Sequence, residues 1–360
     1  MRKGLLLTAT SAALLLGLTA CGSSSTKTPA ATAKKPKIGV ILPDSKSSAR
    51  WETADRKYLS DAFKAAGVQY DIQNAQGDKG QFQTIADQMI TSGVNVLIIV
   101  NLDSGTGKAV LDKAKAQGVA TIDYDRLTLG GSAQYYVSFD NTAVGKLQGD
   151  GLSKCLTDMK AVKPVIAELN GSPTDNNATL FAAGYNGVLD PKYASGEYVK
   201  GPNQSVPDWD NVQGGTIFEQ MLTAQPKIAG VLAANDGLGN AAIAVLKKQK
   251  LNGKVPVTGQ DATVQGLQNI LAGDQCMTVF KDVKKEADAA SALAIDLAKG
   301  KKDTAPTTVD NQGAKTPAVL LIPEAIFKSN ITDVINAGFV SKADLCTPSF
   351  TALCAKAGIQ

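Results

Sequence analysis

The sequence contains no histidine among its 360 residues, and this absence removes several kinds of chemistry at once. A Ser-His-Asp triad, a Cys-His pair and a metal centre held by imidazole are excluded. The chain also lacks a GxxxxGK[ST] phosphate loop and any CxxC spacing of the kind that binds metals. Two carboxylates acting on a glycosidic bond remain open as a catalytic scheme. We expect no metal and no cofactor.

The sequence also lacks a large excess of charge of either sign. The 37 basic and 33 acidic side chains give a net charge of +4, with both signs interspersed. Such a chain lacks the basic stripe that nucleic-acid binding requires, so we expect no nucleic-acid partner. Aromatic residues make up only 5% of the sequence, and two of them are tryptophans, Trp51 and Trp209.

The first 21 residues have the pattern of a secretory signal. A positive start at Arg2 and Lys3 precedes an apolar stretch of about 15 residues, short of the roughly 20 needed to span a bilayer. The stretch ends in LTACG at 18–22, which resembles the lipobox of bacterial lipoproteins. Cys21 is therefore expected to carry a lipid, with an ordinary signal peptide and a chance cysteine as the alternative.

Residues 22–36 contain no large apolar side chain and are expected to form a flexible tether. No later apolar run is long enough to span a membrane. We therefore expect a body outside the cell, anchored to the outer face of the cell membrane by the lipid on Cys21. The roughly 320 residues that remain favour two domains.

From Lys37 onward, short apolar runs alternate with helical segments, which is typical of an α/β fold with parallel sheets. The predicted strands span 37–42, 68–72, 96–100, 119–122, 165–169, 228–233 and 255–259. The predicted helices span 51–66, 81–91, 105–117, 141–155, 177–189, 238–248 and 264–271. These runs indicate two successive doubly wound units.

The last third of the chain does not complete another unit. A strand at 277–280, an Ala-rich helix at 284–299 and an apolar run at 318–322 fit hinge segments that cross between two lobes. We predict an N-terminal lobe of residues 37–139 plus 281–317 and a C-terminal lobe of residues 140–280 plus 318–360. A ligand cleft would lie between their strand ends.

Four cysteines follow Cys21, an even number that favours disulfides in an exported protein. Three connectivities are possible. Cys346 and Cys354 flank a short turn that contains proline, so this pair is favoured, which leaves Cys155 with Cys276. Four free buried thiols are the competing interpretation.

Short polar clusters follow the apolar strand-like runs, at Arg50-Trp51, Asp125-Arg126, Asp175-Asn176-Asn177, Asn235-Asp236, Asp261 and Lys281. Ligands of open α/β sheets bind at the carboxyl ends of the strands. Carboxylates, amides and guanidinium groups make paired hydrogen bonds to neighbouring hydroxyls, and an indole packs on a sugar face. The set therefore favours a carbohydrate ligand. Taken singly, these residues are also typical of helix N-caps, structural ion pairs, core tryptophans and solvated charges.

Seven strings of residues strengthen this interpretation. They are ARW at 49–51, YDR at 124–126, SFDN at 138–141, GSPTDNNATLFAAG at 171–184, AND at 234–236, GQDA at 259–262 and MTVFK at 277–281. In their order and spacing they resemble the periplasmic sugar-binding proteins of ABC importers, of the ribose-like type, over residues 37–339. The lipoprotein signal, the segment 201–207 and the cysteine-bearing tail after Phe339 depart from that family.

The resemblance implies a type I periplasmic binding protein fold, with two doubly wound lobes joined by a multi-strand hinge. It also implies a non-enzymatic, monomeric solute-binding protein that captures a monosaccharide, D-xylose in the first place, and delivers it to a membrane permease with a cytoplasmic ATPase. Glucose and ribose remain open as ligands, and sugar sensing for a membrane receptor and an extracellular glycosidase remain as alternatives. The implied sugar contacts are Arg50, Trp51, Asp125, Arg126, Asp175, Asn177, Trp209, Asn235, Asp261 and Lys281.

Overall fold

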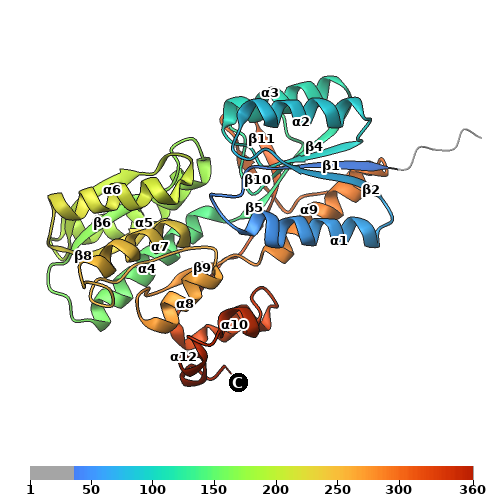
Figure 1. Ribbon diagram of the computed structural model, residues 1–360. Helices are drawn as coiled ribbons and strands as arrows, with labels where there is room; N and C mark the ends of the chain where they lie inside the picture. The colour runs from blue at the N-terminus through green and yellow to red at the C-terminus, as the bar shows by residue number, and fades with distance from the viewer. Residues whose placement is uncertain (1–35, 360) are drawn as a thin grey trace, which may run out of the picture. The chain divides into compact units, whose positions relative to one another are not determined.

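The computed structural model describes residues 36–359 (Figure 1). The predicted signal sequence, the predicted lipidation site Cys21 and all of the predicted tether except residue 36 lie outside the described residues. Within the described part, no helix combines the length and the apolar character needed to cross a membrane.

The first lobe is built on a seven-stranded sheet, parallel except for one edge strand. In spatial order its strands are β10 (Thr307–Asp310), β11 (Lys315–Leu321), β5 (Tyr135–Phe139), β4 (Ala120–Tyr124), β3 (Val96–Ile99), β1 (Lys37–Leu42) and β2 (Gln69–Asn74). Only β10 runs antiparallel to its neighbour. The central strands β3 and β5 are buried along their whole length, as expected for strands covered on both faces.

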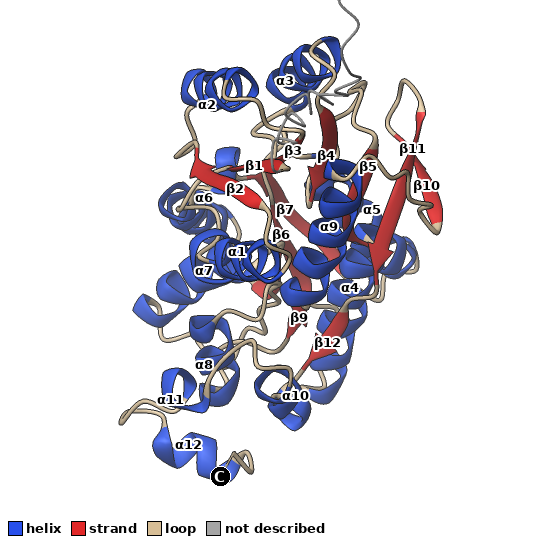
Figure 2. Cartoon of the chain, turned by 90° about the vertical axis from the view of Figure 1, so that its right-hand side faces the viewer, coloured by secondary structure: helices blue, strands red, loops and turns tan. Residues whose placement is uncertain are grey.

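Two pairs of helices cover the faces of this sheet (Figures 1 and 2). One face carries α1 (Arg56–Ala65) and α9 (Val283–Ala298), whose apolar side chains pack with β1, β3 and β4 around Leu59 and Phe63. The other face carries α2 (Lys79–Thr91) and α3 (Ser104–Ala116), which pack around Phe82 and Leu111. A π-helical turn, η1 (Trp51–Asp55), leads directly into α1.

The second lobe is built on a three-stranded parallel sheet in the order β7 (Val199–Ser205), β6 (Val165–Asn170) and β8 (Ile228–Ala233). Its helices are α4 (Asn141–Asp158), α5 (Asn176–Ala194), α6 (Asn211–Ala224), α7 (Asp236–Lys248) and α8 (Val264–Ala272), with a short 3-10 turn η2 (Pro207–Trp209) before α6. One continuous core joins this sheet to α4, α5, α6 and α7.

The end of the chain adds a small core of its own to the second lobe. An antiparallel pair, β9 (Thr278–Phe280) with β12 (Glu324–Ile326), precedes η3 (Lys328–Asn330), α10 (Thr332–Asn336), α11 (Lys342–Leu345) and α12 (Thr351–Lys356). Their apolar side chains pack against α8. Disulfides join Cys346 to Cys354 and Cys155 to Cys276, which are the pairs that the sequence analysis favours.

The chain passes between the two sheets three times. It leaves the first sheet after β5 to begin α4, returns after β9 to begin α9, and leaves again after β11 to begin β12. The three crossings are adjacent, because Leu321 pairs with Phe139 and Glu324 pairs with Phe280. This arrangement is the multi-strand hinge expected from the sequence, and the fold is the predicted type I α/β fold.

The structure differs from the predicted elements in a few places. The run 255–259 makes only an isolated bridge between Val257 and Val231, because Pro256 cannot donate to a ladder. Strand β7 and helix α6 were not predicted, since β7 contains Gly201 and Pro202 and is mostly exposed. The predicted lobe boundary after residue 317 falls inside β11, whose pairing with β5 continues to Leu321. The rest of the lobe assignment stays a prediction.

Candidate functional site

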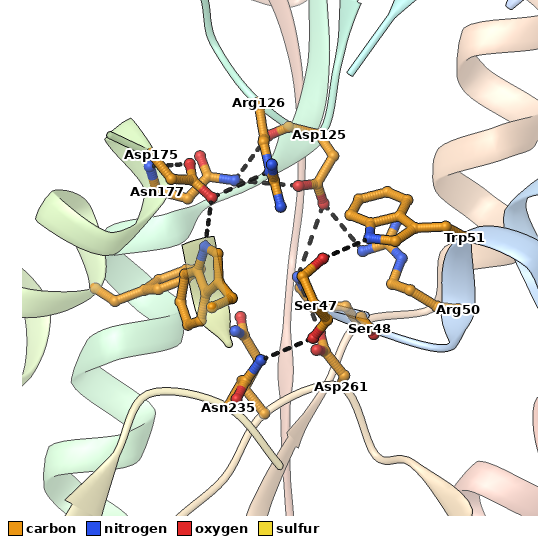
Figure 3. Close-up of a pocket in the computed structure, with 14 residues that line it drawn as sticks. Ser47, Ser48, Arg50, Trp51, Asp125, Arg126, Asp175, Asn177, Asn235 and Asp261 are labelled. Carbon is orange, nitrogen blue, oxygen red and sulfur yellow. Dashed lines mark hydrogen bonds and ion pairs between the residues drawn. The ribbon is translucent and has the colours of Figure 1, made fainter. Parts of the chain in front are cut away.

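One pocket lies where the carboxyl ends of strands from both sheets meet, and fourteen side chains line it (Figure 3). It holds about 330 Å³ of space not occupied by protein atoms, part of which is open to solvent. The structure brings together here all ten residues singled out in the sequence: Arg50, Trp51, Asp125, Arg126, Asp175, Asn177, Trp209, Asn235, Asp261 and Lys281. Ser47, Ser48, Phe181 and Gln260 complete the lining and were not predicted.

Two of these residues cap helices and line the pocket at the same time. Asp175 is the N-cap of α5 and accepts a hydrogen bond from the backbone N–H of Asn177 at 2.9 Å through Oδ1. Its other oxygen, Oδ2, contacts Arg126 and Trp209, which also line the pocket. Asn235 caps α7 in the same way, accepting from the N–H of Leu238 at 2.8 Å. Capping and ligand contact are therefore compatible, because each uses a different polar atom of the side chain.

Arg50 is held by three buried carboxylates. Its Nε and Nη2 donate to Asp55 at 2.9 and 2.8 Å, Nη2 also donates to Glu286 at 2.6 Å, and Nη1 donates to Asp125 at 2.9 Å. These bonds use four of the five guanidinium N–H groups, which leaves one on Nη1 for a ligand. Burial alone would lower the pKa of Arg50, but Asp55, Glu286 and Asp125 outweigh it and raise the pKa above its usual value.

The pKa values of two acids around Arg50 shift in opposite directions. Burial raises the pKa of Glu286 above its usual value, against the opposing charge of Arg50. Burial would also raise the pKa of Asp125, but the charges of Lys281, Arg50 and Arg126 outweigh it and hold the pKa low. Asp125 therefore faces the pocket as a carboxylate, an acceptor at neutral pH.

Lys281 links the two lobes electrostatically. Its ammonium lies 3.1 Å from Asp261 and 3.7 Å from Asp125. Burial alone would lower the pKa of Lys281, and these two carboxylates raise it instead, so the group stays charged. A buried cation between two carboxylates is the arrangement that keeps charges stable away from water.

Further contacts run between residues of the two lobes. Arg126 forms an ion pair with Asp175 at 3.1 Å, and the amide of Asn177 donates to the carbonyl oxygen of Asp125 at 3.0 Å. The amide of Asn235 reaches the carbonyl oxygen of Ser47 at 3.5 Å. Together these contacts place donors and acceptors from both lobes around one small volume (Figure 3).

The two tryptophans lie in different surroundings within the pocket. The guanidinium carbons of Arg50 and Arg126 lie 4.5 and 5.6 Å from the ring centroid of Trp51, close enough for cation–π attraction. The indole N–H of Trp209 donates to Asp175 Oδ2 at 3.1 Å, and Phe181 meets this ring edge-on. Both rings are almost fully buried in the lining of the pocket.

Two residues that organise the site carry no recognisable sequence signal. Asp55 and Glu286 are fully buried and hold Arg50 from behind, without lining the pocket. Glu286 lies 236 residues from Arg50 in an unremarkable helix, so no local pattern could reveal the contact. Asp55 follows Arg50 by five residues, and only the helical turn η1 brings the two side chains together. Among the described residues, no cluster of acidic or cysteine side chains has the arrangement of a metal centre.

The comparisons with known proteins agree with this geometry. The sequence pattern of the periplasmic binding protein domain family matches residues 38–302. The chain is 36% identical to the D-xylose-binding periplasmic protein of Escherichia coli strain K12, over 91% of this chain and 98% of that protein. It is 34% identical to the multiple sugar-binding periplasmic receptor ChvE of Rhizobium radiobacter, over 88% and 94% of the two chains.

A solved structure shows the same architecture. The carbohydrate transporter solute-binding protein of Chloroflexus aurantiacus, in complex with D-glucose, superimposes with a TM-score of 0.79 at 29% identity, covering 86% of this chain and 98% of that one. The chain therefore belongs to the periplasmic binding protein family. Within it, the chain is a sugar-binding, extracytoplasmic component of an ABC transporter, and the relatives named here are two sugar-binding periplasmic proteins and a solute-binding protein of a carbohydrate transporter.

Proposed function

We propose that the pocket binds a single monosaccharide, D-xylose, through the ten residues that the sequence analysis singled out. The observation that carries this proposal is the composition of the lining. Carboxyl groups, guanidinium groups, an ammonium and amides surround about 330 Å³ of unoccupied space, part of it open to solvent, with two indole rings among them. A pyranose needs this combination, because it presents hydroxyls around a rim and C–H bonds on its faces.

Each polar group has a role that follows from its contacts. Asp125, Asp175 and Asp261 accept hydrogen bonds from sugar hydroxyls, since each carboxylate keeps lone pairs beyond those used by its protein partners. Arg50 donates one hydrogen bond through its remaining Nη1–H, and Lys281 donates through its ammonium group. An epimer that leaves one of these buried groups unpaired loses roughly 1–3 kcal/mol.

The choice of sugar rests on the relatives. The relative from Escherichia coli is named for D-xylose, whereas the structure from Chloroflexus aurantiacus contains D-glucose. D-Glucose and D-ribose are therefore the competing ligands that a test must include.

The same proposal extends to the partners and the location. The lipobox-like string at 18–22 supports an anchor on Cys21, on the outer face of the cell membrane. A monomer of the protein, with its lobes closed around the sugar, is then recognised by a permease whose cytoplasmic ATPase drives import. The variant Cys21→Ser tests the anchor separately from the binding site. Cells that express it are expected to release the protein into the medium.

A fluorescence titration tests the proposed ligand. Trp51 and Trp209 are the only tryptophans of the sequence, and both line the pocket, so a bound sugar changes their emission. The full chain is titrated with D-xylose, D-ribose, L-arabinose and D-glucose. We expect a saturable change with D-xylose at the lowest concentrations. Saturation by D-glucose alone would show that D-glucose and not D-xylose is the ligand. No response to any of the four sugars would contradict the proposed function.

A further inference from the structure

Two aspartates of the site, one in each lobe, have similar backbone conformations and similar backbone hydrogen bonds. Asp125 has φ = 62° and Asp261 has φ = 92°, in the left-handed region that side chains other than glycine rarely adopt. The backbone N–H of Asp125 donates to the carbonyl of Val137 at 2.8 Å, and that of Asp261 donates to the carbonyl of Val279, also at 2.8 Å. Both loops therefore turn sharply directly after a bond to the neighbouring strand.

A second, fully buried aspartate fastens each loop just beyond the turn. The carboxylate of Asp123 accepts from both the backbone N–H and the hydroxyl of Thr128, at 2.8 Å each. The carboxylate of Asp236 accepts from the backbone N–H and the hydroxyl of Thr263, at 2.8 and 3.0 Å. The same arrangement therefore occurs in both lobes. A buried aspartate accepts two hydrogen bonds from a threonine that lies two or three residues after the aspartate with positive φ.

Asp236 accepts two more hydrogen bonds, which connect its loop to a further segment of the chain. It accepts from the side chains of Gln275 and Thr278, each at 2.8 Å. The hydroxyl of Thr278 in turn accepts from the backbone N–H of Ala262 at 3.3 Å, and Ala262 also has a positive φ. Asp123 and Asp236 are 1% and 0% exposed, and neither lines the pocket.

We propose that Asp123 and Asp236 are positioning residues, whose carboxylates hold the two loops in the turned form that directs Asp125 and Asp261 into the pocket. The proposal rests on the sugar site proposed above. An unfavourable backbone conformation persists only where its surroundings enforce it. Asp236 accepts four hydrogen bonds and Asp123 accepts two, and these bonds hold the loops in this conformation. A protonated carboxyl group or an amide in the same place would offer fewer acceptor sites.

The charge of the two acids sets the pH range in which they act. Burial raises the pKa of Asp123 to about 7 and that of Asp236 to about 7, against the hydrogen bonds from their threonines. The titratable groups that face them are Asp261, which adds to the rise at Asp236, and Tyr136, the strand partner of Asp123, whose own pKa is raised so that it stays neutral. The loops are therefore held best above about pH 7.

Asp236→Asn and Asp123→Asn test this role in the full chain, with Glu168→Gln as the matched control. Glu168 is an equally buried acid of the second lobe, bonded to Tyr193 and Asn203 and not part of the pocket lining. We expect each aspartate variant to weaken D-xylose binding by about tenfold or more near pH 8, and the control to leave it unchanged.

The pH profile separates positioning from a general loss of structure. Wild-type affinity is expected to fall between about pH 8 and pH 6, and this fall is expected to shrink in Asp236→Asn, which mimics the protonated acid. Wild-type affinity in both aspartate variants, with an unchanged pH profile, would overturn the proposal. Thr263→Val, which removes one donor to Asp236 while keeping the shape of the side chain, serves if Asp236→Asn fails to fold; unaltered affinity in it would count equally against the role.

Amide hydrogen exchange gives a readout that needs no sugar. The backbone N–H groups of Thr128 and Thr263 donate to the two acids, so they are expected to exchange faster in the corresponding asparagine variants than in the control. If the wild-type chain binds none of the sugars tested, the proposed function fails, and exchange alone then decides the positioning role. Unchanged protection at both threonines would overturn it.

Discussion

The indole ring of Trp209 lies directly against the backbone of Gly171, so closely that a Cβ at residue 171 would collide with three ring carbons. The indole N–H bonds to Asp175 on the same loop, so the ring is held at its edge as well as on its face. The string GSPTDNN therefore supplies both a surface for the ring and its hydrogen-bond acceptor.

Replacing Gly171 with Ala is expected to push Trp209 out of this position and to weaken sugar binding by about tenfold or more, since the ring loses both its packing and its bond to Asp175. Fluorescence titration measures the loss. Gly187→Ala is the control, because a Cβ there meets no atom within 4 Å. Equal affinity in the two variants would show that the position of Trp209 does not matter for binding.

Replacing Asp55 with Asn is expected to destabilise the fold, because Arg50 then keeps its buried charge without its bidentate partner. Removing one member of a buried ion pair costs about 3–5 kcal/mol, and the isosteric amide recovers part of this. Urea unfolding measures the change in free energy. Asp61→Asn removes an exposed pair with Lys57 and should leave the unfolding midpoint in place; a similar shift in both variants would contradict the importance of burial.

Replacing Asp261 with Ala is expected to abolish tight sugar binding. Lys281 then loses the carboxylate at 3.1 Å and keeps only the weaker contact with Asp125 at 3.7 Å, and the ligand loses an acceptor. Calorimetric titration measures the affinity, with Asp288→Ala, which removes an exposed pair with Lys284, as the control. Near wild-type affinity in Asp261→Ala would remove this residue from the site.

Stability is expected to fall as the pH rises from about 5 to about 7.5. Asp123 and Asp236 have pKa values of about 7 in the folded chain, above the value near 4 of an unfolded aspartate. The folded chain therefore binds more protons than the unfolded chain in this range, which costs on the order of 1 kcal/mol per group and pH unit as the pH increases.

Thermal unfolding at several pH values measures this slope. The absence of histidine makes the result easy to interpret, since no imidazole titrates in the same window. The double variant Asp123→Asn, Asp236→Asn is expected to reduce the dependence, and Glu286, whose pKa burial also raises, accounts for part of what remains. An unfolding midpoint that increases between about pH 5 and pH 7.5 in the wild-type chain would contradict the raised pKa values.

The fold class and the family could be predicted because their signals are local or periodic. Apolar runs such as 37–42 and 228–233 matched strands residue for residue, since strands buried on both faces need continuous apolar side chains. Nine of the ten candidate site residues stand in the polar clusters that follow strand-like runs, and Trp209 came from the resemblance to the family. Parallel strands bring their ends to one edge, so positions far apart in sequence meet in one pocket.

The features that could not be predicted from the sequence depend on contacts that leave no local sequence pattern. Glu286 and Asp55 are ordinary helical acids until the packing of α9 against η1 surrounds Arg50 with them. Strand β7 lacks apolar periodicity because it is mostly exposed. Phe181 is an apolar residue of α5 with no polar group to suggest a site, and only its position against Trp209 places it in the lining of the pocket.

The three adjacent crossings between the lobes have a mechanical consequence. Phe139, Leu321, Phe280 and Glu324 lie side by side through two strand pairings, and the disulfide of Cys155 and Cys276 ties together the segments that lead to and from two of the crossings. Three parallel connections resist sliding and twisting far more than bending. We therefore expect the pocket to open chiefly by rotation of the lobes about these three crossings, with a bound sugar favouring the closed angle.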